Sequence, residues 1–115
     1  MFDFGYSPNK KGMGKVLGSM ESEIMEIMWK KKRATAKEIF EALKKGKRSS
    51  ISILLQRLCE KGLLSRKEEV AKGGRRYVYF VKIDKRSFER YVVKKVMDSL
   101  IESFEESVKE YLKEI

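Results

Sequence analysis

The spacing of apolar residues predicts three helices in the first half of this 115-residue chain. In residues 19–31, apolar side chains recur every three or four positions, at Met20, Ile24, Ile27 and Met28. This period places them on one face of a helix. Trp29 lies near the end of the segment, where a buried indole in the core or at a helix junction is far more typical than an exposed stacking platform.

A second helix is predicted from Thr35 to about Gly46. Thr35 and Glu38 have the spacing of a capping box, in which the threonine hydroxyl and the glutamate carboxylate each accept a hydrogen bond from a backbone amide. The apolar residues of this helix are Ile39, Phe40 and Leu43.

A third helix is expected between Ser49 and Lys61. Ser49 or Ser50 is its candidate N-cap, because a short hydroxyl side chain can accept from the unpaired amides of a first turn. Gly62 is its candidate C-terminal stop, since glycine adopts the left-handed conformation without steric cost. The apolar face of this helix consists of Ile51, Leu54, Leu55 and Leu58.

Two strands are expected after this helix. The first is Leu63 to Val70, and the second has alternating apolar residues at Tyr77, Tyr79, Val81 and Ile83. Between them, residues 72–76 combine two turn glycines with three cations. Taken alone, such a turn also fits an ordinary solvated hairpin. Directly after the third helix, it favours a hairpin wing that reaches DNA phosphates.

The order of helix, turn, helix, turn, helix and hairpin is that of a winged helix-turn-helix. We therefore expect a mainly α fold with a small β-hairpin (α+β) that binds double-stranded DNA. The polar face of the third helix is assigned to base edges, through Ser50, Ser52, Ile53 and Gln56. Phosphate contacts are assigned to Arg48, Arg57, Lys72, Arg75 and Arg76. Arg57 has an alternative role, in which an ion pair with Glu60 or Glu23 only buttresses the helix.

The C-terminal region, residues 84–115, contains no Gly or Pro and predicts helix. Asp84 is a candidate N-cap, and a second capping-box pattern at residues 107–110 predicts a break near Glu105. We expect its apolar stripe to form a two-fold dimer interface. The interface residues are Phe88, Tyr91, Val92, Val96, Leu100, Phe104, Val108, Tyr111 and Leu112. The alternative is that the stripe packs on the chain's own head.

The remaining part of the chain, residues 1–16, has no helical or strand periodicity. It contains the only Pro, three Gly and three Lys, which favours a disordered or loosely packed N-terminal arm over a basic arm that enters a minor groove. It lacks the apolar core of a signal peptide, and no segment reaches the length of a membrane-spanning helix. The expected organisation is this arm, a DNA-binding domain at 17–83 and a helical dimerisation region at 84–115, in a cytoplasmic protein without membrane contacts.

The distribution of charge agrees with this division. Residues 1–83 carry 20 Lys and Arg against 9 Asp and Glu, a net charge of +11, whereas residues 84–115 carry 7 against 8, a net charge of −1. A basic head on a nearly neutral tail indicates that polyanion binding is confined to the head.

Catalysis and metal binding are not expected. The chain has no His, which removes the commonest general base and metal ligand. The single Cys59 can form neither an intrachain disulfide nor a Cys/His zinc site. Residues 72–75 lack the spacing of a nucleotide-binding loop. The sequence therefore predicts a protein that is not an enzyme and holds no cofactor or metal.

Four segments of the sequence resemble the penicillinase-repressor family. They are the opening Leu17-Gly18-Ser19-Met20-Glu21 with Trp29 at the end of the same helix, Ala34–Ile39 at the start of the second helix, Gln56–Leu64 and the wing Gly74–Tyr79. The RLxxKGLL pattern within Gln56–Leu64 is common to many winged-helix regulators, whereas its combination with the tryptophan-ended helix is fairly specific. The resemblance extends from Leu17 to the C-terminus.

The resemblance implies a homodimeric repressor, with the winged-helix domain on an operator half-site and the C-terminal helices holding two copies together. Copper-sensing relatives carry a C-terminal cysteine cluster, which residues 102–115 lack, so metal sensing by that route is not expected. No pattern identifies the inducer as a small molecule or a protein, and a ligand pocket lined by Tyr91, Met97 or Phe104 stays open. The rival functions are a winged-helix protein-interaction module of the transcription machinery and a nonspecific chromatin-type DNA-binding protein.

Overall fold

The computed structural model describes residues 4–115, and the part of the predicted N-terminal arm at residues 1–3 lies outside the described residues. The chain groups into two compact units, Met1–Asp84 and Lys85–Ile115. Each unit is described by itself below.

The first unit contains the helices that the apolar spacing predicted. They are α1 (Ser19–Lys31), α2 (Ala36–Leu43) and α3 (Arg48–Glu60), preceded by a short 3-10 helix, η1 (Gly12–Lys15). In the segment before α1, the Ser7 amide donates to the Lys15 carbonyl oxygen at 2.6 Å, and Val16 and Leu17 are buried.

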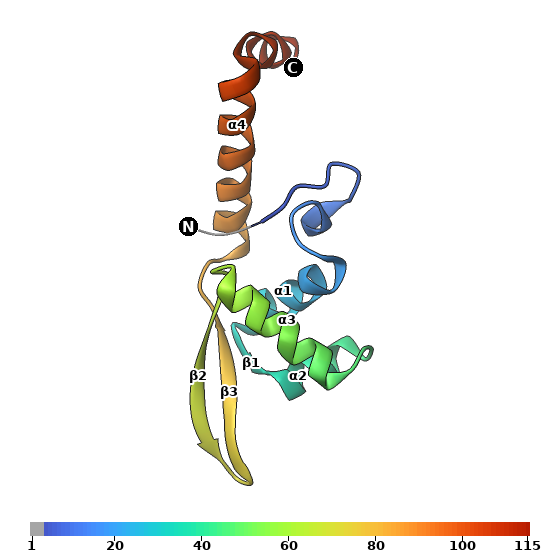
Figure 1. Ribbon diagram of the computed structural model, residues 1–115, viewed down its shortest axis with the longest axis vertical. Helices are drawn as coiled ribbons and strands as arrows, with labels where there is room; N and C mark the ends of the chain where they lie inside the picture. Colours follow the sequence, from blue (N-terminus) through green and yellow to red (C-terminus); the bar gives the residue numbers. More distant parts are fainter. Residues whose placement is uncertain (1–3) are drawn as a thin grey trace. The chain divides into compact units, whose positions relative to one another are not determined.

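An antiparallel sheet completes this unit. Within residues 4–115 it has three strands, β1 (Arg33–Thr35), β2 (Leu64–Ala71) and β3 (Gly74–Val81), in the order β1-β3-β2. β2 and β3 are the two predicted strands, and Figure 1 shows their hairpin extending beyond the helices. β1 was not predicted, because three residues carry no readable period and this segment is a strand only through pairing with β3. The predicted fold class, mainly α with a small β wing, is confirmed.

The core lies where α1, α2 and α3 meet the base of the sheet. Its largest fully buried side chains include Ile24, Met28, Ile39, Leu55 and Leu58 from the three helices. Trp29 is 6% exposed and its indole Nε1 donates to the Ile83 carbonyl oxygen at 2.9 Å, which confirms its predicted core role. Because these contacts hold α3 by its apolar face, the opposite face of α3 is left for solvent or a ligand.

The helix ends confirm two predictions and correct a third. At α2, the Glu38 amide donates to Thr35 Oγ1 at 3.2 Å and the Thr35 amide donates to Glu38 Oε1 at 2.9 Å, as a capping box requires. After α3, Gly62 has the positive φ of 88° that favours glycine. The serine N-cap predicted for α3 is wrong: the helix begins at Arg48, and its N-cap Lys47, two residues before Ser49, makes no side-chain capping bond.

The second unit is α4 (Lys85–Glu114), which starts directly after Asp84. The predicted break near Glu105 is confirmed at Phe104, where φ is −138° and ψ is 45°, so the element consists of two helices joined by a kink. Figure 1 shows the last turns bending away from the axis of the longer first part. The predicted interface residues lie along this unit with unequal exposure: Phe88 is buried, whereas Leu100, Phe104, Tyr111 and Leu112 are 39–60% exposed.

Candidate nucleic-acid interface

The exposed face of α3 carries the residues predicted to contact bases. Burial of Ile51, Leu55 and Leu58 turns the intervening positions outward, which is the direct result of the 3.6-residue period. All four predicted base-contacting side chains are exposed, namely Ser50, Ser52, Ile53 and Gln56. Ile53 is 55% exposed, so this apolar side chain contributes little to the core and is available to a partner.

Gln56 has an interaction within its own helix. Its Nε2 donates to Glu60 Oε1 at 3.4 Å, which is long for a hydrogen bond and therefore weak.

The alternative role of Arg57 was an ion pair with Glu60 or Glu23. The Glu60 carboxylate accepts from Gln56, and the Glu23 carboxylate pairs with Lys45 at 2.8 Å. Within residues 4–115 neither carboxylate pairs with Arg57, so the alternative role of Arg57 as a buttress is not supported.

The wing presents cations that differ in their partners. Arg75 pairs with Glu68 at 3.0 Å, and Arg76 lies 3.9 Å from Glu69. The turn between the strands is Lys72-Gly73, where Gly73 has a φ of 96°. Exposed pairs of this kind contribute about 0–1 kcal/mol to folding, so a phosphate can replace the carboxylates at small cost.

A groove runs between the outer face of α3, the start of α2 and the wing, with a volume of about 370 Å³. It brings together three of the predicted base-contacting residues, Ser52, Ile53 and Gln56, with two predicted phosphate ligands, Arg48 and Arg76. The other residues predicted to contact DNA lie outside its lining, and they are Ser50, Arg57, Lys72 and Arg75. Residues from separate parts of the sequence thus form one concave, basic surface.

The groove also contains residues that the sequence analysis missed. Lys37 lines it from the start of α2, and Arg66, Tyr77 and Tyr79 line it from the wing. The Arg66 guanidinium carbon lies 4.2 Å from the centre of the Tyr77 ring. The register that places Arg66 opposite Tyr79 would have revealed this cluster, but a strand pairing is not readable from alternation alone.

Burial shifts the pKa of two side chains, Tyr79 in the lining of the groove and Cys59 of α3. Burial raises the pKa of the Tyr79 hydroxyl, against the lowering effect of a hydrogen bond with Arg66. Burial likewise raises the pKa of the Cys59 thiol. Both groups are therefore neutral at physiological pH, and the charge of the groove comes from its lysine and arginines.

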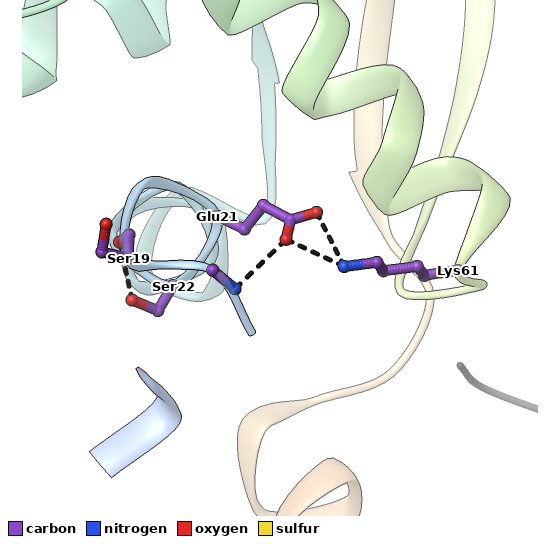
Figure 2. Close-up of polar contacts among 5 residues, drawn as sticks. Ser19, Glu21, Ser22 and Lys61 are labelled. Atoms are coloured by element: carbon purple, nitrogen blue, oxygen red, sulfur yellow. Dashed lines mark hydrogen bonds and ion pairs between the residues drawn. The ribbon is translucent and has the colours of Figure 1, made fainter. Parts of the chain in front are cut away.

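An ion pair inside the unit joins the start of α1 to the end of α3. Figure 2 shows the Glu21 carboxylate between the two elements: its Oε1 accepts from Lys61 Nζ at 2.8 Å and from the Gly18 amide at 3.2 Å. The Glu21 side chain is only 8% exposed and that of Lys61 28%. Removing Lys61 would leave the Glu21 carboxylate buried without a partner charge, and this lowers the stability of the fold. The pair therefore holds the C-terminal end of α3 against α1.

Comparison with known proteins decides the family. The model of the penicillinase repressor family matches residues 17–115, which is most of the chain. The chain belongs to this family. As a member of the penicillinase repressor family it is a DNA-binding transcriptional regulator, and the resemblance seen in the sequence is confirmed.

Solved structures support the fold of this family member. A "possible transcriptional regulator" from Methanosarcina mazei Go1 has a TM-score of 0.62 at 20% identity, covering 83% of this chain and 79% of its own. A PadR family transcription regulator from Clostridium difficile R20291 has a TM-score of 0.51 at 22% identity, covering 73% and 99%. Stf76 from the Sulfolobus islandicus plasmid-virus pSSVx has a TM-score of 0.50 at 22% identity, covering 64% and 94%. At these identities the likeness concerns the fold alone.

A comparison with the curated proteins finds no match. In the part of the chain that the structure describes, no helix is long and apolar enough to cross a membrane. The same residues include no group of three or more His, Cys, Asp or Glu side chains that could hold a metal ion.

Proposed function

We propose that this penicillinase-repressor family member is a homodimeric repressor that binds a palindromic operator. The observation that carries the proposal is the groove in which Ser52, Ile53 and Gln56 lie next to Arg48 and Arg76. Hydroxyl and amide groups can donate to and accept from base edges, and isoleucine can lie against a thymine methyl group. Cations next to them would hold the phosphates that fix the register of the helix.

In this proposal, base contacts come from Ser50, Ser52, Ile53 and Gln56, and phosphate contacts from Arg48, Arg57, Lys72, Arg75 and Arg76. Two heads on a two-fold axis would then read two half-sites. The support for a two-fold assembly is the exposed apolar stripe of α4, in which Leu100, Phe104, Tyr111 and Leu112 are each at least 39% exposed. Two copies that cover these side chains remove apolar surface from water.

The test is a titration of the full-length protein against duplexes that it selects from a random-sequence library and against random duplex. A dimer that neutralises about six to ten phosphates should lose affinity on the order of 10³–10⁵-fold between about 50 and 200 mM salt. Selected duplexes should contain an inverted repeat, because a two-fold protein reads the same half-site twice.

Two outcomes would contradict the proposal. A flat salt response would favour the rival, a winged helix that docks to a protein of the transcription machinery. Equal affinity for selected and random duplexes would instead indicate a nonspecific chromatin-type protein.

A further inference from the structure

The side chain of Arg66 lies on the face of the wing that is turned toward α3. Arg66 is paired in register with Tyr79, and Tyr77 is the next residue on the same face of β3, because side chains alternate along a strand. All three residues line the groove together with Ser52 and Gln56 of α3. Arg66 therefore lies across the groove from the proposed base-contacting side chains of α3, although it belongs neither to α3 nor to the turn of the wing.

Tyr77 holds the Arg66 guanidinium in a defined orientation. The guanidinium carbon is 4.2 Å from the ring centre, well inside the range of a cation–π contact. Stacking occupies one face of the planar group, and part of its N–H edge hydrogen-bonds to the Tyr79 hydroxyl. A guanidinium has five N–H donors, so others are left to donate to a ligand. Tyr77 is 42% exposed, so its ring is not simply part of the core.

The charge of Arg66 is also uncompensated. Within residues 4–115 the ion pairs of the wing join Glu68 to Arg75 and Glu69 to Arg76 and Arg33, and Arg66 has no carboxylate partner. An anion that enters the groove therefore meets Arg66 without displacing an acidic side chain. At Arg75 and Arg76 the same anion would first have to displace a glutamate.

Further cations line the groove on the side of α2 and α3. They are Lys37 at the start of α2 and Arg48 at the start of α3. With Arg66 and Arg76 they bring the cations among the described lining residues to four, against no acidic residue, and this charge attracts an anion. A guanidinium presented edge-on matches phosphate oxygens in a bidentate arrangement.

We infer that Arg66, oriented by the Tyr77 ring, binds a phosphate of the DNA strand that passes between α3 and the wing. The inference rests on the proposed DNA-binding function and adds to it a phosphate ligand and a positioning residue. Arg66 makes the contact, and Tyr77 acts through Arg66.

The test compares Arg66→Met with Arg33→Met in the full-length protein, on selected and random duplexes. Arg33 is the matched control: it stacks on Phe80 at 5.4 Å and pairs with Glu69, but it does not line the groove. Arg66→Met should weaken binding to both duplexes by about tenfold per protomer. It should also lower the salt slope by about one for each phosphate that the variant no longer neutralises. Arg33→Met should change both quantities much less.

Tyr77 is tested through its coupling to Arg66. Tyr77→Phe keeps the ring and should retain wild-type affinity and salt slope, whereas Tyr77→Leu should reproduce part of the Arg66→Met loss. In the Arg66→Met background, Tyr77→Leu should have no further effect. If it weakens binding there as well, the ring contacts DNA by itself and the positioning role is wrong.

The outcomes separate this inference from the function on which it rests. If the wild-type protein binds duplex with a steep salt slope but Arg66→Met behaves like Arg33→Met, the Arg66 assignment is overturned and the DNA-binding function stands. A loss confined to selected duplex would assign Arg66 to a base and overturn the phosphate contact. If the wild-type protein shows no salt-dependent binding to any duplex, the proposed function itself is wrong.

Discussion

At the scale of single residues, Gln56 is the proposed base-contacting side chain that carries an amide, with both donor and acceptor groups. It is exposed on α3, lines the groove, and donates a 3.4 Å hydrogen bond to Glu60. A glutamine amide can donate and accept at once, which matches the paired acceptor and donor of adenine in the major groove. Releasing such a long hydrogen bond costs little, so the amide is available to DNA.

We predict that Gln56→Ala lowers affinity for the selected duplex by roughly 1–3 kcal/mol and barely changes affinity for random duplex. Arg75→Ala should weaken both about equally, because a phosphate contact is independent of sequence. Fluorescence anisotropy titrations on the two duplexes measure both quantities.

The control is Asn9→Ala, which removes the only other side-chain amide in the sequence from an exposed position outside the groove. It should leave both affinities unchanged. If Gln56→Ala and Arg75→Ala give the same pattern of losses, α3 does not read bases as proposed.

At the scale of elements, the capping box decides where α2 begins. The hydrogen bond from the Thr35 backbone amide is the largest of the effects that lower the pKa of Glu38 below its usual 4.5. A carboxylate whose pKa falls on folding contributes stability above its unfolded pKa and loses it as the pH falls through the folded pKa. The start of α2, which lines the groove, should therefore be most firmly held at neutral pH.

We predict that Glu38→Gln lowers the free energy of unfolding at pH 7 and that its deficit relative to the wild type shrinks as the pH falls below 4.5. Thr35→Ala, which removes the other half of the box, should cost about 0.5–2 kcal/mol. Urea denaturation followed by circular dichroism at several pH values measures these differences.

Thr35→Ser is the control, because it keeps the capping hydroxyl and should retain most of the stability. A Glu38→Gln deficit that stays constant from neutral to acidic pH would show that the Glu38 charge adds nothing to the cap.

At the scale of the whole molecule, the exposed stripe of α4 is the feature that a single chain leaves unexplained. Phe88 is buried within the chain, so it is not available to a second copy. The exposed apolar residues lie farther along, where Leu100 is 39%, Phe104 59% and Tyr111 60% exposed. The proposed dimer contact therefore concentrates around and beyond the kink at Phe104.

We predict that Leu100→Glu converts the proposed dimer into a monomer at micromolar concentration, because it places a charge within the apolar stripe. Tethering of two sites raises overall affinity by about 10²–10⁴-fold, so the monomer should bind a full operator far more weakly while half-site contacts survive. Sedimentation velocity and operator titrations measure the two effects.

Lys94→Glu is the control, since it places the same carboxylate at an exposed position two residues from both Val92 and Val96, and therefore on the opposite face of the helix. It should stay dimeric. A wild-type protein that sediments as a monomer, or a Leu100→Glu variant that remains dimeric with full operator affinity, would contradict the two-fold model.

The sequence by itself determined the elements whose signals are local. The 3.6-residue spacing of Ile51, Leu55 and Leu58 predicted both α3 and its buried face, because period and face are properties of the helix alone. The capping box at Thr35 and the glycine stop at Gly62 act within a few residues and were predicted correctly. The family could also be read from the sequence, since its motifs are continuous segments.

Only the tertiary structure decided what depends on residues far apart in the chain. β1 exists because Arg33–Thr35 pairs with residues 78–80, and the Arg66–Tyr77 contact exists because of the register of β2 and β3. The serine cap expected for α3 failed because the helix extends back to Arg48, and a cap preference is too weak to decide a boundary. Strand pairing, register and the groove between α3 and the wing are long-range contacts, and local patterns contain no information about which distant residues they join.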